Sequence, residues 1–172
     1  PLTAYRLLSD FVPLNPRNRP HNLNQPPQFV IQNAANSAVG EAVIQIGKLW
    51  KVKTINLIRD RFVHFVCVAR FVGFLMPTLN SEDIDVVKSH LSSLGADVVL
   101  TYSEFLQRES RSAIKELVQG AELRLALNCV GGDETTEMAK LLNNGHLVTY
   151  GGMAKRALKI PPSLFIYKQL TL

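Results

Sequence analysis

Residues 29–61 read FVIQNAANSAVGEAVIQIGKLWKVKTINLIRDR, and this stretch decides the fold. A short apolar run leads through small side chains into residues 37–49, where apolar positions recur at helical spacing. A second apolar run follows at residues 53–58. This order predicts a βαβ unit with a tight first turn, in which a helix N-terminus presents its N–H groups and positive dipole end to a phosphate.

The residues after the second apolar run discriminate between two cofactors. A dinucleotide-binding fold has its ribose-contacting residue roughly 20 positions beyond the turn, and Arg59, Asp60 and Arg61 occupy that place. A lone carboxylate favours a ribose 2′-hydroxyl, whereas guanidinium groups bind a 2′-phosphate bidentately and with full charge. We therefore expect these three residues to contact NADPH rather than NADH.

The turn after the first apolar run is weak evidence for dinucleotide binding when it is considered alone. Of the glycines in a GxGxxG motif only Gly40 remains, and Ser37 stands where a second glycine is common. Gly40 could serve only to let the helix pack closely on the sheet, and the two arginines could belong to a solvated loop. Both alternatives remain open from the residues alone.

Helix and strand patterns alternate along most of the chain. The N-terminal segment 3–11 has helical spacing, and a Pro-rich surface loop is expected at 15–27. Further helices are predicted at 83–94, 111–118 and 134–142, and further strands at 97–100, 123–128 and 146–150. This alternation requires an α/β, Rossmann-type, doubly wound parallel sheet with helices on both faces. The length of 172 residues fits a single domain covering residues 1–172.

Composition and charge exclude several other classes of protein. The chain carries a net charge of +5, but its basic residues are scattered without interleaved aromatics, so we expect no nucleic-acid partner. The longest apolar stretch, 62–75, is too short to cross a bilayer and contains His64 and Arg70. Neither the two cysteines nor the four histidines have metal-site spacing.

The loop after the last predicted strand is the second candidate binding element. Tyr150, Gly151, Gly152 and Met153 follow a strand whose carboxyl end faces the nicotinamide side of such a crevice, and paired glycines permit backbone contact with a ligand. A simple flexible turn is the alternative. Cys129 is interpreted as a small apolar residue. Tyr102 and Tyr167 are interpreted as packing or surface residues rather than proton donors, because neither lies in a loop expected to face the nicotinamide.

Several motifs together resemble one enzyme family. VIQNAANSAVGEAVIQIGK, TINLIRDR, SLGADVVLT, LALNCVGG and LVTYGGMAK are similar to the mitochondrial trans-2-enoyl-thioester (enoyl-CoA or enoyl-acyl-carrier-protein) reductases of the medium-chain dehydrogenase/reductase superfamily. The resemblance implies NADPH as cofactor. It assigns the cofactor contacts to Asn36, Ser37, Ala38 and Val39 at the pyrophosphate, to Arg59, Asp60 and Arg61 at the 2′-phosphate, and to Tyr150, Gly151, Gly152 and Met153 at the nicotinamide.

The resemblance also implies a reaction. A hydride passes from NADPH to the β-carbon of a trans-2-enoyl thioester in mitochondrial fatty acid synthesis, and a tyrosine protonates the α-carbon. In the family that tyrosine belongs to a separate catalytic domain, which we expect to be absent from this chain. The resemblance further implies a mitochondrial location and a homodimer, with an enoyl thioester of CoA or acyl carrier protein as substrate.

One departure from the family pattern is an apolar insertion at 62–81, directly after Arg61. Relatives join this turn almost directly to the next helix, so the insertion could crowd the ribose pocket. Two alternative functions remain open: a quinone-reductase-like enzyme, and a non-catalytic truncated isoform that binds a partner protein. Comparing NADPH with NADH in thermal stabilisation would separate the cofactor domain from the non-catalytic module.

We expect the 172-residue chain by itself to be catalytically silent, because the resemblance assigns it the cofactor contacts without the proton donor. The measurement is the decrease in NADPH absorbance when purified chain is mixed with a trans-2-enoyl-CoA. Enzyme-dependent turnover above the no-protein blank would contradict this prediction.

Overall fold

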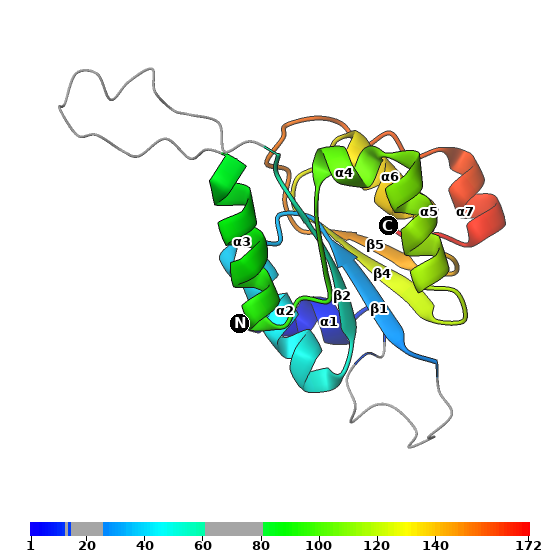
Figure 1. Ribbon diagram of the computed structural model, residues 1–172. Coiled ribbons are helices and arrows are strands. Elements are labelled where there is room, and N and C mark those ends of the chain that lie inside the picture. Colours follow the sequence, from blue (N-terminus) through cyan, green and yellow to red (C-terminus); the bar gives the residue numbers. More distant parts are fainter. Residues whose placement is uncertain (13, 15–25, 61–80) are drawn as a thin grey trace.

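The computed structural model describes residues 1–12, 14, 26–60 and 81–172 (Figure 1). At its centre is a five-stranded parallel sheet with the strand order β3-β2-β1-β4-β5. The strands are β1 (Gln28–Gln32), β2 (Lys53–Ile58), β3 (Val98–Thr101), β4 (Glu122–Asn128) and β5 (His146–Thr149). The predicted doubly wound sheet is confirmed, because the chain extends the sheet from β1 first in one direction and then in the other.

Helices cover both faces of the sheet, as predicted (Figure 1). One layer holds α1 (Leu2–Ser9), α2 (Ala38–Trp50) and α3 (Ser81–Leu94); the other holds α4 (Tyr102–Leu106), α5 (Arg108–Leu117), α6 (Asp133–Leu141) and α7 (Pro162–Lys168). All five residues of β1 are buried between the layers. Continuous burial is typical of a central parallel strand with helices on both sides.

Two helices were not predicted from the sequence. Helix α4 follows β3 without a loop, and it begins at a capping box in which Thr101 and Glu104 bond each other's backbone N–H groups. Helix α7 begins at Pro162 after an extended segment. Thr171 then pairs beside β5, where its carbonyl accepts from the Leu147 N–H at 2.8 Å.

Three expected features fall largely or wholly outside the described residues. The loop at 15–27 is described only at Pro26 and Pro27, and the insertion at 62–81 only at Ser81, the first residue of α3. Arg61 also lies outside the described part of the chain. No helix in the described ranges is both long and apolar enough to cross a bilayer.

Helix α2 lies unusually close to the sheet because of two glycines on its inner face. A Cβ on Gly40 would come within 2.5 Å of the Ala35 carbonyl oxygen, and one on Gly47 within 3.0 Å of the Thr54 side chain. The first of these distances is a backbone overlap that a side-chain rotation cannot relieve. Gly40 therefore sets how closely the start of α2 approaches the end of β1, so the close-packing role considered from the sequence is present.

We predict that Gly40→Ala lowers the free energy of unfolding by about 3 kcal/mol, because the added methyl overpacks against fixed backbone. The control is Gly152→Ala, where an added Cβ meets nothing within 4 Å, and a change of about 0.5 kcal/mol or less is expected. Urea unfolding followed by circular dichroism measures both. Equal destabilisation by the two substitutions would show that close packing at Gly40 is not the cause.

Candidate functional site

The candidate site lies at the carboxyl edge of the sheet, between β1 and β4. The connections from these two adjacent strands leave toward opposite faces of the sheet, which opens a crevice at the point where the winding reverses. The loops after β1, β4 and β5 reach this edge, as do Arg59 and Asp60 directly after β2 (Figure 1). They contain every described residue that the sequence analysis selected for cofactor contact.

The turn after β1 ends at the N-terminus of α2. Ser37 is the N-cap residue, and its Oγ accepts a hydrogen bond from the Gly40 N–H at 3.1 Å. Helix geometry leaves the N–H groups of Ala38 and Val39 without carbonyl partners inside α2. Ala38 is exposed, whereas Asn36 and Val39 are half-buried. The turn thus presents unpaired N–H groups at a positive dipole end, which suits an anion.

The exit of β2 places Arg59 and Asp60 differently. Arg59 is exposed, and its side chain is free to meet a ligand. Asp60 Oδ1 accepts a hydrogen bond from the Ser103 N–H at 2.8 Å, at the first turn of α4. Partial burial acts to raise the pKa of Asp60, but hydrogen bonds from Ser103 and Thr101 outweigh it and hold the pKa below its usual value. Asp60 therefore anchors the β2 exit to α4.

A cleft of about 480 Å³ opens beside Arg59 and Asp60. Its walls include Tyr102 and Ser103 from the start of α4, Glu134 from α6, and Ala154 and Arg156 from the segment after β5. The sequence analysis did not select Arg156, although it lies only three residues beyond Met153. Two exposed arginines from separate loops thus line one cleft, and only the fold brings them together.

Tyr102 connects the cleft to the turn after β1. Its ring is buried, with 8% exposure, and its hydroxyl oxygen accepts a hydrogen bond from the Ala34 N–H at 3.3 Å. Burial, the largest effect, raises the pKa of this hydroxyl above its ordinary value. Tyr102 therefore has the packing role expected from the sequence. Tyr167, on α7, is 83% exposed.

A buried amide network joins the exits of β1 and β4. The Asn33 Nδ2 amide donates to Asn128 Oδ1 at 2.8 Å, while Asn33 Oδ1 accepts from the Cys129 N–H at 2.7 Å. Asn128 Oδ1 also accepts from the N–H groups of Val130 and Gly131 and from the Thr135 hydroxyl. The network fixes both loops at the switch point. Sequence reasoning missed it, although an asparagine at the end of each apolar strand was a usable signal.

The loop after β5 runs beside the loop after β4. Backbone N–H groups of Met153 and Ala154 donate to the carbonyls of Cys129 and Val130, at 3.0 and 2.9 Å. A Cβ on Gly151 would lie 2.7 Å from Cys129 Sγ, so only glycine fits there. By contrast, Gly152 faces open space and Met153 is 56% exposed. The exposed part of the predicted nicotinamide-side loop is therefore Gly152 and Met153.

Tyr150 ties this loop to the turn after β1. Its side chain packs in the same apolar cluster as Val39, and its hydroxyl oxygen is buried. Burial first, and then the neighbouring Cys129 thiol, raise the pKa of the Tyr150 hydroxyl above its ordinary value, while Ser37 acts in the opposite direction. The hydroxyl thus stays neutral at physiological pH. Tyr150 brings the two predicted loops into one site.

Within the described ranges, no group of three or more His, Cys, Asp or Glu side chains is arranged to hold a metal ion. The donors that converge at the crevice are instead backbone N–H groups and guanidinium groups. Their preferred ligands are phosphates rather than cations.

Comparisons with known proteins show which proteins this chain resembles. No protein-family model matches the sequence. The mitochondrial enoyl-[acyl-carrier-protein] reductase of Mus musculus is 42% identical over the whole of this chain, which spans 38% of that protein. A reductase of the same name from Candida tropicalis is 39% identical. The chain therefore corresponds to somewhat more than a third of the relatives it matches.

Solved structures of 2-enoyl thioester reductases are also similar to this chain. The Etr1p/NADP/crotonyl-CoA complex superposes with a TM-score of 0.76 and 38% identity, covering 99% of this chain and 40% of that one. A 2-enoyl thioester reductase Etr1p/Etr2p heterodimer from Candida tropicalis superposes with the same TM-score and 37% identity, with the same coverage. A putative NADPH:quinone reductase from Bacillus thuringiensis is only 19% identical, with a TM-score of 0.64, and shares the fold.

We predict that Asp60→Asn destabilises the chain at neutral pH and that the difference vanishes in acid. Because the folded state lowers the pKa of Asp60, its stabilising effect is present above the usual value of 3.8 and is lost as the pH falls through the lowered value. Unfolding free energies of both proteins between pH 2 and 7 measure this. Asp85→Asn, at an exposed position, is the control for removing a charge. A difference that stays constant down to pH 2 would contradict the prediction.

Proposed function

Because this chain is homologous from end to end to a segment of the mitochondrial enoyl-[acyl-carrier-protein] reductases, we propose that it is the NADPH-binding domain of an enoyl-thioester reductase. The whole protein would reduce trans-2-enoyl thioesters to acyl thioesters in mitochondrial fatty acid synthesis. Residues 1–172 supply the cofactor-binding part, and the catalytic domain is a separate unit.

The observation that carries this proposal is the convergence of two phosphate-binding elements at one switch point. The capped N-terminus of α2 follows β1, the cleft is lined by Arg59 and Arg156, and the buried Asn33–Asn128 pair joins the ends of β1 and β4 at the same edge of the sheet. A nicotinamide dinucleotide phosphate has a pyrophosphate and a separate 2′-phosphate, and it requires both elements. NADH requires only the first of them.

The residues present fit this cofactor. Gly40 and Gly151 each have a backbone or sulfur neighbour so close that a side chain would fill the space between the loops. We assign the pyrophosphate to the turn formed by Asn36, Ser37, Ala38 and Val39. We assign the 2′-phosphate to Arg59 and Arg61, to which the structure suggests adding Arg156. We assign the nicotinamide side to Tyr150, Gly151, Gly152 and Met153, of which Gly152 and Met153 are the exposed pair.

In this proposal the chain positions the cofactor and does not move protons. NADPH, when bound, supplies a hydride to the β-carbon of the enoyl thioester, and the α-carbon takes up a proton. The two tyrosine hydroxyls near the crevice are poor donors, because burial raises the pKa of each. Their role is to hold the loops, and the proton comes from outside this domain.

Asp60 has an indirect role in this assignment. Its carboxylate is already engaged by the Ser103 N–H, so it orients the β2 exit and leaves the guanidinium groups to meet the 2′-phosphate. This resolves the conflict between one acidic and two basic side chains in the Arg59–Arg61 tripeptide. A free carboxylate at that position would repel a phosphate.

We propose a mitochondrial location, a thioester of CoA or acyl carrier protein as substrate, and a dimer as the state of the whole protein. The curated relatives named above are mitochondrial, and the Candida tropicalis structures include a crotonyl-CoA complex and a heterodimer. These points support the proposal over a quinone-reductase-like activity, because the quinone reductase compared shares half as much identity.

We predict that Arg59→Ala/Arg61→Ala weakens NADPH binding at least tenfold while leaving NADH binding within twofold, because only NADPH has the 2′-phosphate. Fluorescence titration of the chain with each nucleotide gives the two dissociation constants. Lys48→Ala/Lys51→Ala removes the same charge from exposed positions in the last turn and at the C-cap of α2, and it is expected to change neither dissociation constant. An unchanged NADPH/NADH ratio in the arginine variant would contradict the proposed function.

A further inference from the structure

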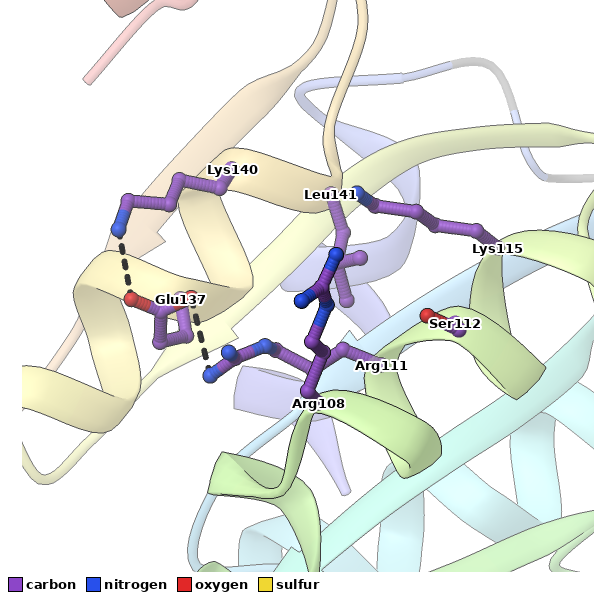
Figure 2. Close-up of a pocket in the computed structure, with 7 residues that line it drawn as sticks. All are labelled: Arg108, Arg111, Ser112, Lys115, Glu137, Lys140 and Leu141. Atoms are coloured by element: carbon purple, nitrogen blue, oxygen red, sulfur yellow. Dashed lines mark hydrogen bonds and ion pairs between the residues drawn. The ribbon is translucent and has the colours of Figure 1, made fainter.

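A second cationic pocket lies between α5 and α6, in the helical layer formed by α4 to α7 (Figure 2). Arg108, Arg111, Ser112 and Lys115 line it from α5, at the i, i+3, i+4 and i+7 positions of one helix face. Lys140 enters from α6, as does one acidic side chain, Glu137. Four cations therefore surround one carboxylate around a hollow of about 330 Å³.

The Glu137 carboxylate pairs with two of the four cations, so the pocket keeps a net positive charge. Glu137 Oε2 lies 3.3 Å from the Arg111 guanidinium, and Oε1 lies 2.6 Å from Lys140 Nζ. The Arg111 guanidinium also donates to the Leu106 carbonyl at 2.9 Å. The Glu137 side chain is 19% exposed, so these contacts hold one arginine and one lysine in place from beneath.

Arg108 and Lys115 are different, because no carboxylate among the described residues pairs with either side chain. Figure 2 shows both reaching from α5 toward Leu141 of α6, apart from the Arg111–Glu137 ion pair. A fifth cation is close by: Lys168 of α7 donates to the Lys140 and Leu142 carbonyls. Burial first, and then repulsion from Lys115, lower the pKa of Lys168. Positive side chains therefore outnumber carboxylates in the region between α5, α6 and α7.

We propose that this pocket binds a free small anion that carries a diphosphate group. The planar guanidinium of Arg108 can bind phosphate oxygens in pairs, Lys115 adds a point charge, and Ser112 adds a hydroxyl group on the same helix face. The pre-ordered Arg111–Glu137–Lys140 group forms the floor and costs little to organise on binding.

A diphosphate fits these observations better than an acidic segment of a protein. The cations converge on one concave site, which matches a ligand with several charges in a small volume. An acidic helix would need its partner charges spread along a ridge. The pocket also shares no lining residue with the cleft beside Arg59. Binding here is therefore independent of the proposed NADPH site.

The test uses the 172-residue chain and sodium pyrophosphate, followed by backbone amide NMR. We expect saturable shifts in α5 and at residues 137–141, with an affinity that falls as chloride is added. Arg108→Gln/Lys115→Gln should weaken this affinity at least tenfold. Lys48→Gln/Lys51→Gln removes the same charge from the C-terminal end of α2, on the other face of the sheet, and should change this affinity less than twofold.

Three outcomes would overturn the proposal. The first is pyrophosphate-induced shifts confined to the turn after β1 or the cleft beside Arg59, which would locate anion binding at the nucleotide site alone. The second is an equal loss in both double variants, which would indicate only general attraction to a basic protein. The third is tighter binding of a hexaglutamate peptide than of pyrophosphate at the same amides, which would assign the pocket to an acidic protein. None of these outcomes depends on whether NADPH binds.

Discussion

The amide pair between Asn33 and Asn128 is the contact on which the candidate site depends. It joins the ends of β1 and β4, the two neighbouring strands whose connections cross to opposite faces of the sheet. Asn128 Oδ1 accepts from four donors, and all of them are buried. A buried acceptor that is satisfied this fully is costly to disturb, because each donor left without it would lose its partner away from water. The loops that border the crevice therefore start from fixed points.

Much of this fold was predictable from hydrophobic periodicity. The runs FVIQ, TINLI and LALN are strands within one or two residues of where they were expected, and the helix predicted from residue 37 begins at Ala38, with Ser37 as its N-cap. Local patterning suffices for these elements because each strand is buried on both faces and each helix on one. Helix α4 escaped prediction because its capping box joins directly to β3, and five residues contain too little periodicity to recognise.

The site was predictable only in part, and for a physical reason. Ser37 and Arg59 are local features of one βαβ unit, so spacing alone located them. Arg156 reaches the cleft from a loop almost a hundred residues later, and the link from Tyr102 to the turn after β1 is equally non-local. Asp60 illustrates a different limit. Its position was foreseen, but its partner, the Ser103 N–H, belongs to a helix that the sequence pattern did not reveal.

The two hydrogen bonds between the loops after β4 and β5 have a consequence for how the molecule can vary. Met153 and Ala154 bond the carbonyls of Cys129 and Val130, so the two loops are held side by side. Gly151 lies against Cys129 at the same contact. An inserted or deleted residue in either loop would shift the register of both bonds. A length change in one of these loops therefore disturbs the other as well, whereas the exposed Ala38 side chain lies outside this contact.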